Sequence, residues 1–319
     1  MMMMRNSIAA LLVTVLGAAA EAQETADTLL VNGRIYTLES ARPWVDAIAI
    51  RGERILAVGT NEEARRFTGP KTREIDLAGA FVSPGFNDSH VHVDGTGALL
   101  TGVNLLDVHE PKAFAERIRG AAERLPKGSW ITRGMWGAYE QWEAGSSGDT
   151  ASSRKTSGPF TPDRSLIDAE TRDHPVLVSR FDRSMHLANS LALKLAGIDE
   201  STPSPPEGKI GKDAGGRLTG ILEGKAVDLV EKVIPPISFE QRLVQVRAVL
   251  KEAREGGVTT VQDLTSAEQL LAYQHLKAQG ELTVRIMIRP NIFQAERVAA
   301  LGLTRGFGDD WLKLVGYKG

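Results

Sequence analysis

The chain has 319 residues and a mass of 34.5 kDa, which is enough for one large α/β domain with an appendage or for two ordinary domains. Lys and Arg total 38 and Asp and Glu total 40, so the formal net charge of −2 lacks the basic excess typical of nucleic-acid-binding proteins. The sequence contains no cysteine, which excludes disulfide bonds, thiolate metal ligands and a cysteine nucleophile.

The N-terminal segment has the pattern of a secretory signal peptide. Arg5 precedes an apolar run over 8–20, and the small residues Ala20 and Ala22 flank Glu21 at the expected cleavage point. The run is too short to span a bilayer comfortably, so we expect cleavage after Ala22 and a periplasmic or secreted mature chain without stable membrane insertion. An uncleaved anchor is the alternative interpretation.

Short strands follow one another in the next segment, and we predict that they form a small antiparallel sheet. Asn32 and Gly33 have the sequence of a tight turn between the first two strands. The last strand ends at Pro84 and Gly85. The expected strands are 28–31, 34–38, 47–51, 54–58, 74–77 and 80–83, with a helical turn at 61–67.

Helices and strands alternate from Ser238 onward. Ser238 with Gln241, and Ser266 with Gln269, have the capping-box spacing that begins a helix. This alternation predicts βα units and a parallel sheet, with a barrel as the favoured closure. The expected strands are 258–262, 283–289 and 312–317, with a weaker helix at 295–301.

A subdomain is expected to be inserted between the strands at 80–83 and 258–262, because about 170 residues separate strands that a βα unit joins with roughly 30. We predict that its polar Gly/Ser/Pro-rich stretches are loops, either lids and binding elements or solvated surface. Its expected strands are 130–133 and 175–181, and its expected loops are 143–165 and 199–216.

Two histidines just past the strand at 80–83 can hold a metal ion. His90 and His92 share a face in an extended segment, so their imidazoles can bind one ion, a geometry suited to zinc. Catalytic groups of parallel α/β folds gather at the carboxyl ends of strands. A His-x-His pair is by itself a weak signal, and a pair that merely faces solvent is the alternative.

Several segments taken in order match one family. They are residues 30–37, Pro84-Gly85-Phe86 with Asp88, His90 and His92, Trp130-Ile131 with Gly134 and Trp136, His186 with Asn189-Ser190 and Ala192-Leu193, 219–223, 256–261 with Asp263, and 316–319. In this set the sequence resembles the amidohydrolase superfamily, specifically the exported amidohydrolase-3 type group that includes N-substituted formamide deformylase-like proteins. The resemblance covers nearly the whole mature chain.

The resemblance implies a metal-dependent hydrolase fold, an α/β TIM-like (β/α)8 barrel with a β-sandwich built from both chain ends. One or two divalent ions are implied at the barrel mouth, bound by His90 and His92. Lys318 matches the lysine that carries a carboxyl group on its side-chain nitrogen and bridges two metals, and a solvated terminal lysine is the alternative interpretation. Lys313 is the rival, on the opposite face of the strand expected at 312–317. Zinc is the first choice of metal, and manganese, iron and cobalt suit the same nitrogen and oxygen ligands.

Other matching residues are candidates for substrate contact or for support of the metal ligands. They are Asp88, His186, Glu223 and Asp263. His186 contacts substrate or closes the site, or else makes a structural hydrogen bond that orders the helix start at Asn189. Glu223 and Asp263 either bind or orient groups near the metal or are buried hydrogen-bond partners. The family's catalytic aspartate and two further metal-binding histidines have no match, so the catalytic residue is unknown and expected to lie beyond Gly319.

The activity implied is hydrolysis of a non-peptide carbon–nitrogen bond of the amide type in a small molecule. A bound metal lowers the pKa of water and so supplies hydroxide for attack on a carbonyl without a protein nucleophile. No nucleic-acid partner is expected, and a homodimer is compatible with the family. Two alternatives stay open: a truncated, inactive chain that is at most a binding or assembly module, and a metal-dependent esterase on the same fold.

The expected organisation has five segments. They are a signal peptide (1–22), the N-terminal part of a composite β-sandwich (23–79), the first barrel strand with the metal motif (80–103), the inserted α/β subdomain (104–236) and truncated barrel βα units (237–319). Counting from the strand of His90 gives four of the eight strands that a closed barrel requires, so we expect the barrel to be incomplete in this chain.

Overall fold

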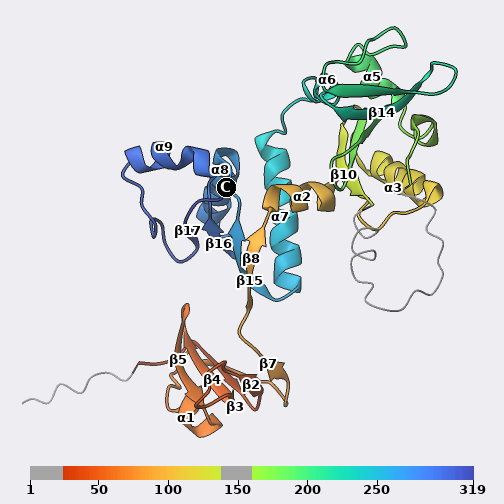
Figure 1. Cartoon of the computed structure of the whole chain (residues 1–319). Coiled ribbons are helices and arrows are strands. Elements are labelled where there is room, and N and C mark those ends of the chain that lie inside the picture. The colour runs from red at the N-terminus through yellow and green to blue at the C-terminus, as the bar shows by residue number, and fades with distance from the viewer. Residues whose placement is uncertain (1–23, 138–159) are drawn as a thin grey trace, which may run out of the picture. The chain divides into compact units, whose positions relative to one another are not determined.

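The computed structural model describes residues 24–137 and 160–319, which form two compact units divided between Pro84 and Gly85 (Figure 1). The expected signal peptide at 1–22 and most of the loop expected at 143–165 lie outside the described residues. In the described part of the chain, no helix is both long and apolar enough to cross a bilayer.

The first unit contains two small sheets, one of four strands in the order β5-β4-β1-β6 and one of three strands in the order β3-β2-β7. The elements are β1 (Thr28–Val31), β2 (Arg34–Tyr36), β3 (Trp44–Val45), β4 (Ala47–Arg51), β5 (Arg54–Gly59), α1 (Asn61–Arg65), β6 (Arg73–Asp76) and β7 (Phe81–Val82). Because β7 pairs with β2, this unit extends to Pro84.

The predicted hairpin at Asn32 and Gly33 in a single antiparallel sheet is wrong. Asn32 adopts a left-handed φ of 55° and directs the chain from β1 in one sheet to β2 in the other. β1 pairs antiparallel with β4 but parallel with β6. Ile35 and Val45 of the smaller sheet form one buried apolar cluster with Ile48 of the larger sheet. Packing between two sheets therefore determines the path of the turn.

The second unit contains a four-stranded parallel sheet in the order β17-β16-β15-β8. Its strands are β8 (Phe86–Val91), β15 (Val258–Asp263), β16 (Arg285–Ile288) and β17 (Leu312–Leu314), and its helices are α7 (Phe239–Glu255), α8 (Ala267–Ala278) and α9 (Ala295–Ala300), with the short turn η2 (Ile292–Gln294). Both predicted capping boxes are confirmed, at Ser238 with Gln241 and at Ser266 with Gln269.

Helices α7 and α8 bury one face of this parallel sheet. The core side chains of the strands are Val261, Ile286, Ile288, Leu312 and Leu314, which meet Leu243, Val246, Leu250, Tyr273 and Leu276 of the helices. Full burial of each large aliphatic side chain contributes about 1.5–3 kcal/mol. The alternate positions carry Gln262, Met287 and Lys313 in register on the other face. The described residues form four parallel strands and not a closed barrel.

A six-stranded mixed sheet, in the order β13-β14-β12-β11-β10-β9, is built from the residues between β8 and α7. Its elements are β9 (Val103–Asn104), α3 (Pro111–Arg124), β10 (Ile131–Trp136), η1 (Arg164–Leu166), β11 (Val176–Arg180), β12 (His186–Ala188), α5 (Ser190–Leu195), β13 (Gly208–Lys212), β14 (Leu218–Gly224) and α6 (Asp228–Glu231). The loop predicted at 199–216 is wrong in part, because 208–212 pairs with β14 across a turn fixed by Asp213.

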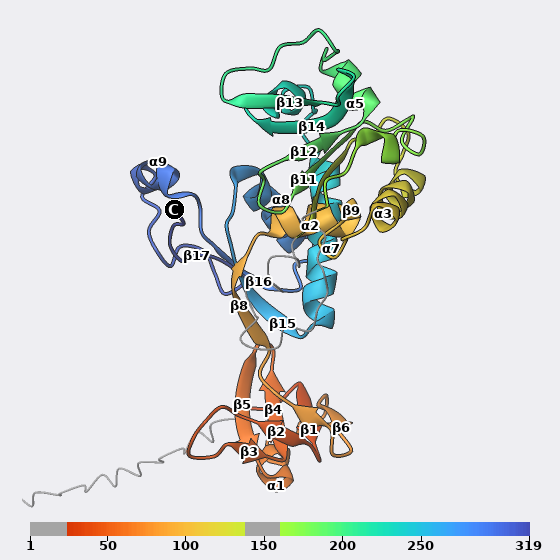
Figure 2. The same cartoon turned by 45° about the vertical axis from the view of Figure 1, so that its right-hand side comes forward.

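Helix α2 (Val93–Thr101) connects the two sheets of the second unit. It begins directly after β8 and contacts α7 along one side and β9 and β10 on another (Figure 2). A Cβ atom on Gly97 would lie 2.9 Å from the backbone oxygen of Gln245, so only glycine permits this close approach of α2 to α7. The position of α2 is therefore constrained from both sides.

Candidate metal site

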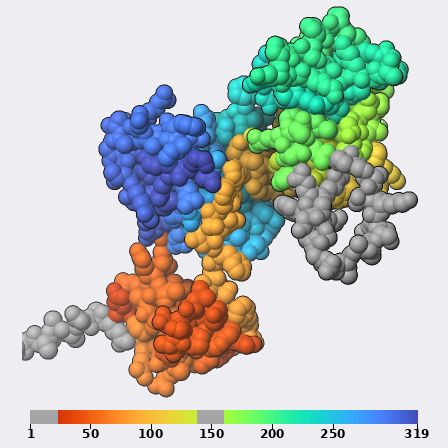
Figure 3. Space-filling view, viewed as in Figure 1, coloured from red at the N-terminus to blue at the C-terminus, as the bar shows by residue number. Residues whose placement is uncertain are grey.

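His90 lies within a strand, β8, and His92 follows the last residue of that strand. The prediction that the histidine segment lies just past the end of the strand at 80–83 is wrong, because Phe86 donates its N–H to the carbonyl of Gly257 at 2.9 Å and so begins the pairing of β8 with β15. β8 is an edge strand, and its segment lies open on the surface in light orange in Figure 3.

The rings of His90 and His92 lie together at the carboxyl end of β8. Their Nε2 atoms are 3.0 Å apart, and the ring centroids are separated by 5.1 Å with an angle of 28° between the planes. Val91, between them, packs on the apolar core, so the two histidines extend from the other side of the strand. Both side chains are exposed.

This donor pair fits a divalent metal ion. Two nitrogens 3.0 Å apart can both reach one ion at the usual distance of about 2.0–2.1 Å, and neutral imidazole is a common ligand. Among residues 24–137 and 160–319, no group of three or more His, Asp or Glu side chains converges on a metal-sized space. The described part of the chain thus contributes the two histidines and not a complete ligand shell.

Asp88 and Asp263 hold the backbone around the histidine pair. Asp88 accepts the N–H of His90 at 3.0 Å, a local contact within β8. Asp263, at the end of β15, is fully buried, and its Oδ1 accepts the N–H of Val93, the first residue of α2, at 2.9 Å. His92 is the N-cap of this helix, so Asp263 fixes the backbone immediately beside it.

The other oxygen of Asp263 is also engaged. Oδ2 accepts the hydroxyl of Thr265 at 2.8 Å and that of Tyr273 at 2.7 Å. Burial raises the pKa of Asp263, and these donors together with His92 oppose the rise. Sequence reasoning missed Tyr273, although its position on the apolar face of the helix that begins at Ser266 was a usable signal.

The two candidate lysines do not share a strand, contrary to prediction. β17 ends at Leu314, and Lys318 instead bridges to the chain beyond β16: its N–H donates to Pro290 at 3.0 Å and its carbonyl accepts from Ile292 at 2.7 Å. Lys313 lies on the sheet face that α7 and α8 leave uncovered, with its Nζ 3.1 Å from Asp310.

His186 and Glu223 belong to the six-stranded sheet. His186 is opposite Ser179 on β11 and Leu222 on β14, so its side chain shares their face. Glu223, one residue after Leu222, points to the other face and pairs with Lys209 at 3.1 Å. The sheet therefore does not bring these two predicted site residues together.

The ring of His186 is partly buried, and its Nδ1 has no hydrogen-bond partner among the described residues. Burial, assisted by the charge of Arg183, lowers the pKa of His186. The helix start at Asn189 is ordered by Asn189 itself, whose side chain accepts the N–H groups of Ala192 and Val176 and donates to the carbonyl of His174.

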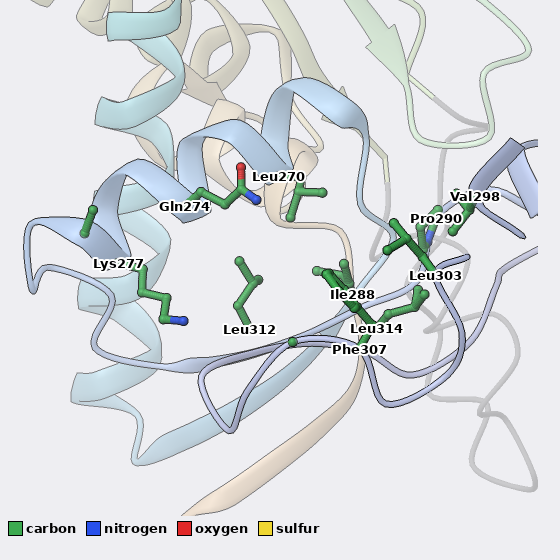
Figure 4. A pocket seen from close by; sticks show the side chains of 12 residues that line it. Leu270, Gln274, Lys277, Ile288, Pro290, Val298, Leu303, Phe307, Leu312 and Leu314 are labelled. Carbon is green, nitrogen blue, oxygen red and sulfur yellow. The ribbon is translucent and has the colours of Figure 1, made fainter. Parts of the chain in front are cut away.

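An apolar pocket of about 600 Å³ lies between α8 and strands β16 and β17 (Figure 4). Its lining includes Ile288, Leu312 and Leu314 from the helix-covered face of the sheet. Lys277 at its side is paired with Asp309, and this ammonium lowers the pKa of Asp309 to about 2. The pocket is thus on the face of the sheet opposite Lys313 and is not part of the candidate metal site.

Comparisons with known proteins identify the family to which the chain is similar. Residues 73–318 match the model of the amidohydrolase family. The chain is 34% identical to Protein LONG AFTER FAR-RED 3 of Arabidopsis thaliana over 92% of this chain and 50% of that protein. It is 25% identical to N-substituted formamide deformylase of Arthrobacter pascens over 80% of this chain and 46% of that protein. The chain therefore spans about half the length of these curated relatives.

A solved structure has the same fold. It is an uncharacterized metal-dependent hydrolase from Pyrococcus horikoshii OT3, which superposes with a TM-score of 0.64 at 24% sequence identity over 91% of this chain and 53% of that one. At this identity the similarity concerns the fold, a mixed α/β architecture.

Proposed function

This chain belongs to the amidohydrolase family, and from that premise we propose that it takes part in metal-dependent hydrolysis of a non-peptide, amide-type carbon–nitrogen bond in a small molecule. Family membership and the formamide deformylase relative support a hydrolase that acts on carbon–nitrogen bonds. The observation that carries the proposal is the 3.0 Å separation of the Nε2 atoms of His90 and His92 at the carboxyl end of a parallel strand.

The residues of this chain have two different roles at the proposed site, metal binding and support of the backbone. His90 and His92 would hold the ion, with zinc as the first choice, while Asp88 and Asp263 keep the backbone of β8 and α2 in place. When bound, a divalent ion supplies an acidified water and polarises a carbonyl group. We assign Asp263 a supporting role, because its side chain is fully buried and each of its oxygens accepts a hydrogen bond from Val93, Thr265 or Tyr273.

We propose Lys318 as the lysine that becomes carboxylated and bridges two ions. Its backbone is held at Pro290 and Ile292, beyond the end of β16. Lys313 is the alternative because it lies on the uncovered face of the sheet. We further propose that the four parallel strands belong to a (β/α)8 barrel.

Metal analysis tests the proposal directly. In the full chain carrying His90→Ala with His92→Ala, bound zinc after reconstitution is expected to fall below about a tenth of the parent content, because both imidazole ligands are lost. The matched control is His109→Ala with His275→Ala, which changes one histidine in the loop before α3 and one in α8 and is expected to leave zinc unchanged. Lys318→Ala and Lys313→Ala, assayed alongside, identify the lysine that contributes to metal content.

Two outcomes would contradict the proposal. Unchanged zinc in the double-histidine variant removes the metal site from β8. Turnover of simple esters without any hydrolysis of formamides or other small amides by the reconstituted protein replaces the bond assignment with an esterase.

We also propose that residues 1–22 direct export. Expression of the full reading frame in a bacterium is expected to yield a periplasmic protein whose N-terminus, read by mass spectrometry, is Gln23. Ala22→Arg should block this cleavage, because signal peptidase sites require small residues. Recovery of the intact N-terminus in the cytosol would refute export.

A further inference from the structure

The first turn of α2 carries a carboxylate that joins three elements. Asp94 follows His92 by two residues, and its Oδ2 lies 2.9 Å from Nη2 of Arg133 on β10. Its Oδ1 lies 3.4 Å from Nη1 of Arg242 on α7. The arginines are 39 and 148 residues away along the chain, so the contacts exist only in the folded unit.

Arg133 reaches Asp94 from a strained segment. Arg133, Gly134 and Met135 have consecutive positive φ angles of 71°, 67° and 59°, and the register between β10 and β11 shifts across them. Left-handed conformations of residues other than glycine cost about 1–3 kcal/mol each and persist where the surroundings fix them. Here the hydroxyl of Ser179 donates to the carbonyl of Arg133 at 3.3 Å, and the Arg133 side chain is directed to Asp94.

The position of the second arginine, Arg242, is determined by the start of α7. Arg242 lies in the first turn of that helix, just after the capping box of Ser238 and Gln241, and its side chain is only 15% exposed. An exposed ion pair contributes little to stability, but a carboxylate shared by two arginines on separate elements restricts the orientation of the turn that carries it.

We propose that Asp94 is a positioning residue for the histidine pair: held by Arg133 and Arg242, it fixes the first turn of α2 and with it the ring of His92. This inference rests on the proposed function, since it assigns the purpose of the clamp to a metal site. Asp263 holds the backbone of the same turn at Val93, and Asp94 adds the side-chain contacts that prevent the turn from rotating.

The experiment measures zinc affinity of the full chain by competition with a chromophoric chelator. Asp94→Asn is expected to weaken zinc binding about tenfold, as is usual when a group that orients a metal ligand is lost. Asp107→Asn is the matched control, because Asp107 lies outside α2 and forms an ion pair at the same 2.9 Å with Arg117, an arginine about as exposed as Arg133. This control should bind zinc as the parent does.

Arg133→Met distinguishes positioning from simple charge. Removing a cation near the site would tighten zinc binding if Asp94 and Arg133 acted only through their charges. If they position His92, Arg133→Met weakens zinc binding as Asp94→Asn does. Tighter binding in Arg133→Met, or parent affinity in Asp94→Asn, overturns the inference.

A metal-free measurement separates this inference from the proposed function. The amides of Val93 and Thr96 are hydrogen-bonded to Asp263 and to the carbonyl of His92, and their hydrogen exchange is expected to accelerate about tenfold in Asp94→Asn as the turn loosens. Absence of zinc from the parent protein counts against the proposed function alone, and the exchange rates then decide whether the clamp exists. Unchanged exchange rates reject the clamp.

Discussion

The two sheets of the second unit differ in whether they bring their predicted site residues together. In the parallel sheet, the strand ends share one edge, so His92 after β8 and Asp263 at the end of β15 are neighbours although 170 residues of sequence separate Val93 from Asp263. In the mixed sheet, His186 on β12 pairs with Leu222 on β14, so Glu223, the residue after Leu222, points to the opposite face of the sheet.

The difference shows why functional side chains meet at one edge of a parallel sheet. Each parallel strand ends at the same edge, and a polar residue placed after any of them contributes to one site. In an antiparallel pair the strand ends alternate, and a polar residue meets only its cross-strand partner, as Glu223 meets Lys209. The candidate metal site therefore lies at β8, with α2 as the element that connects the parallel sheet to the mixed one.

The largest effect should come from the buried carboxylate of the parallel sheet. Asp263→Ala leaves the N–H of Val93 and the hydroxyls of Thr265 and Tyr273 without their acceptor, so we expect a loss of about 3 kcal/mol in the free energy of unfolding. Urea unfolding of the full chain measures it.

Glu223→Ala is the counterpart in the mixed sheet. It removes an ion pair that is largely exposed, and we expect a change of less than about 0.5 kcal/mol. Equal losses of unfolding free energy in Asp263→Ala and Glu223→Ala would contradict the proposed difference between the two sheets.

An effect between these two should come from the bulge in β10. Gly134→Ala places a Cβ 2.7 Å from Cδ1 of Leu105 at a φ of +67°, and overpacking together with the left-handed conformation should cost about 2–3 kcal/mol. Gly128→Ala has a similar φ of +84° with no neighbour within 4 Å, so we expect about 1 kcal/mol. Thermal unfolding compares the stabilities of the two variants. If Gly134→Ala loses no more stability than Gly128→Ala, the bulge can move to accommodate the added Cβ.

Local sequence determined the elements that depend on neighbouring residues. Capping boxes at Ser238 and Ser266 begin the helices as predicted, because both hydrogen bonds of each box join residues three apart. The alternation of helix and strand likewise predicted the parallel order of β15, β16 and β17. His90 in β8 and His92 directly after it extend to the same side for the same local reason, the two-residue period of extended backbone.

Only tertiary structure decided the rest. Asn32 and Gly33 suit a hairpin by themselves, but packing between two sheets directs them elsewhere. The Gly- and Pro-rich composition of 199–216 concealed β13, whose pairing depends on β14. The contact of Asp94 with Arg242 spans 148 residues, and no local pattern encodes it, because the energy of an ion pair depends on the distance between its charges in space and not on their separation in sequence.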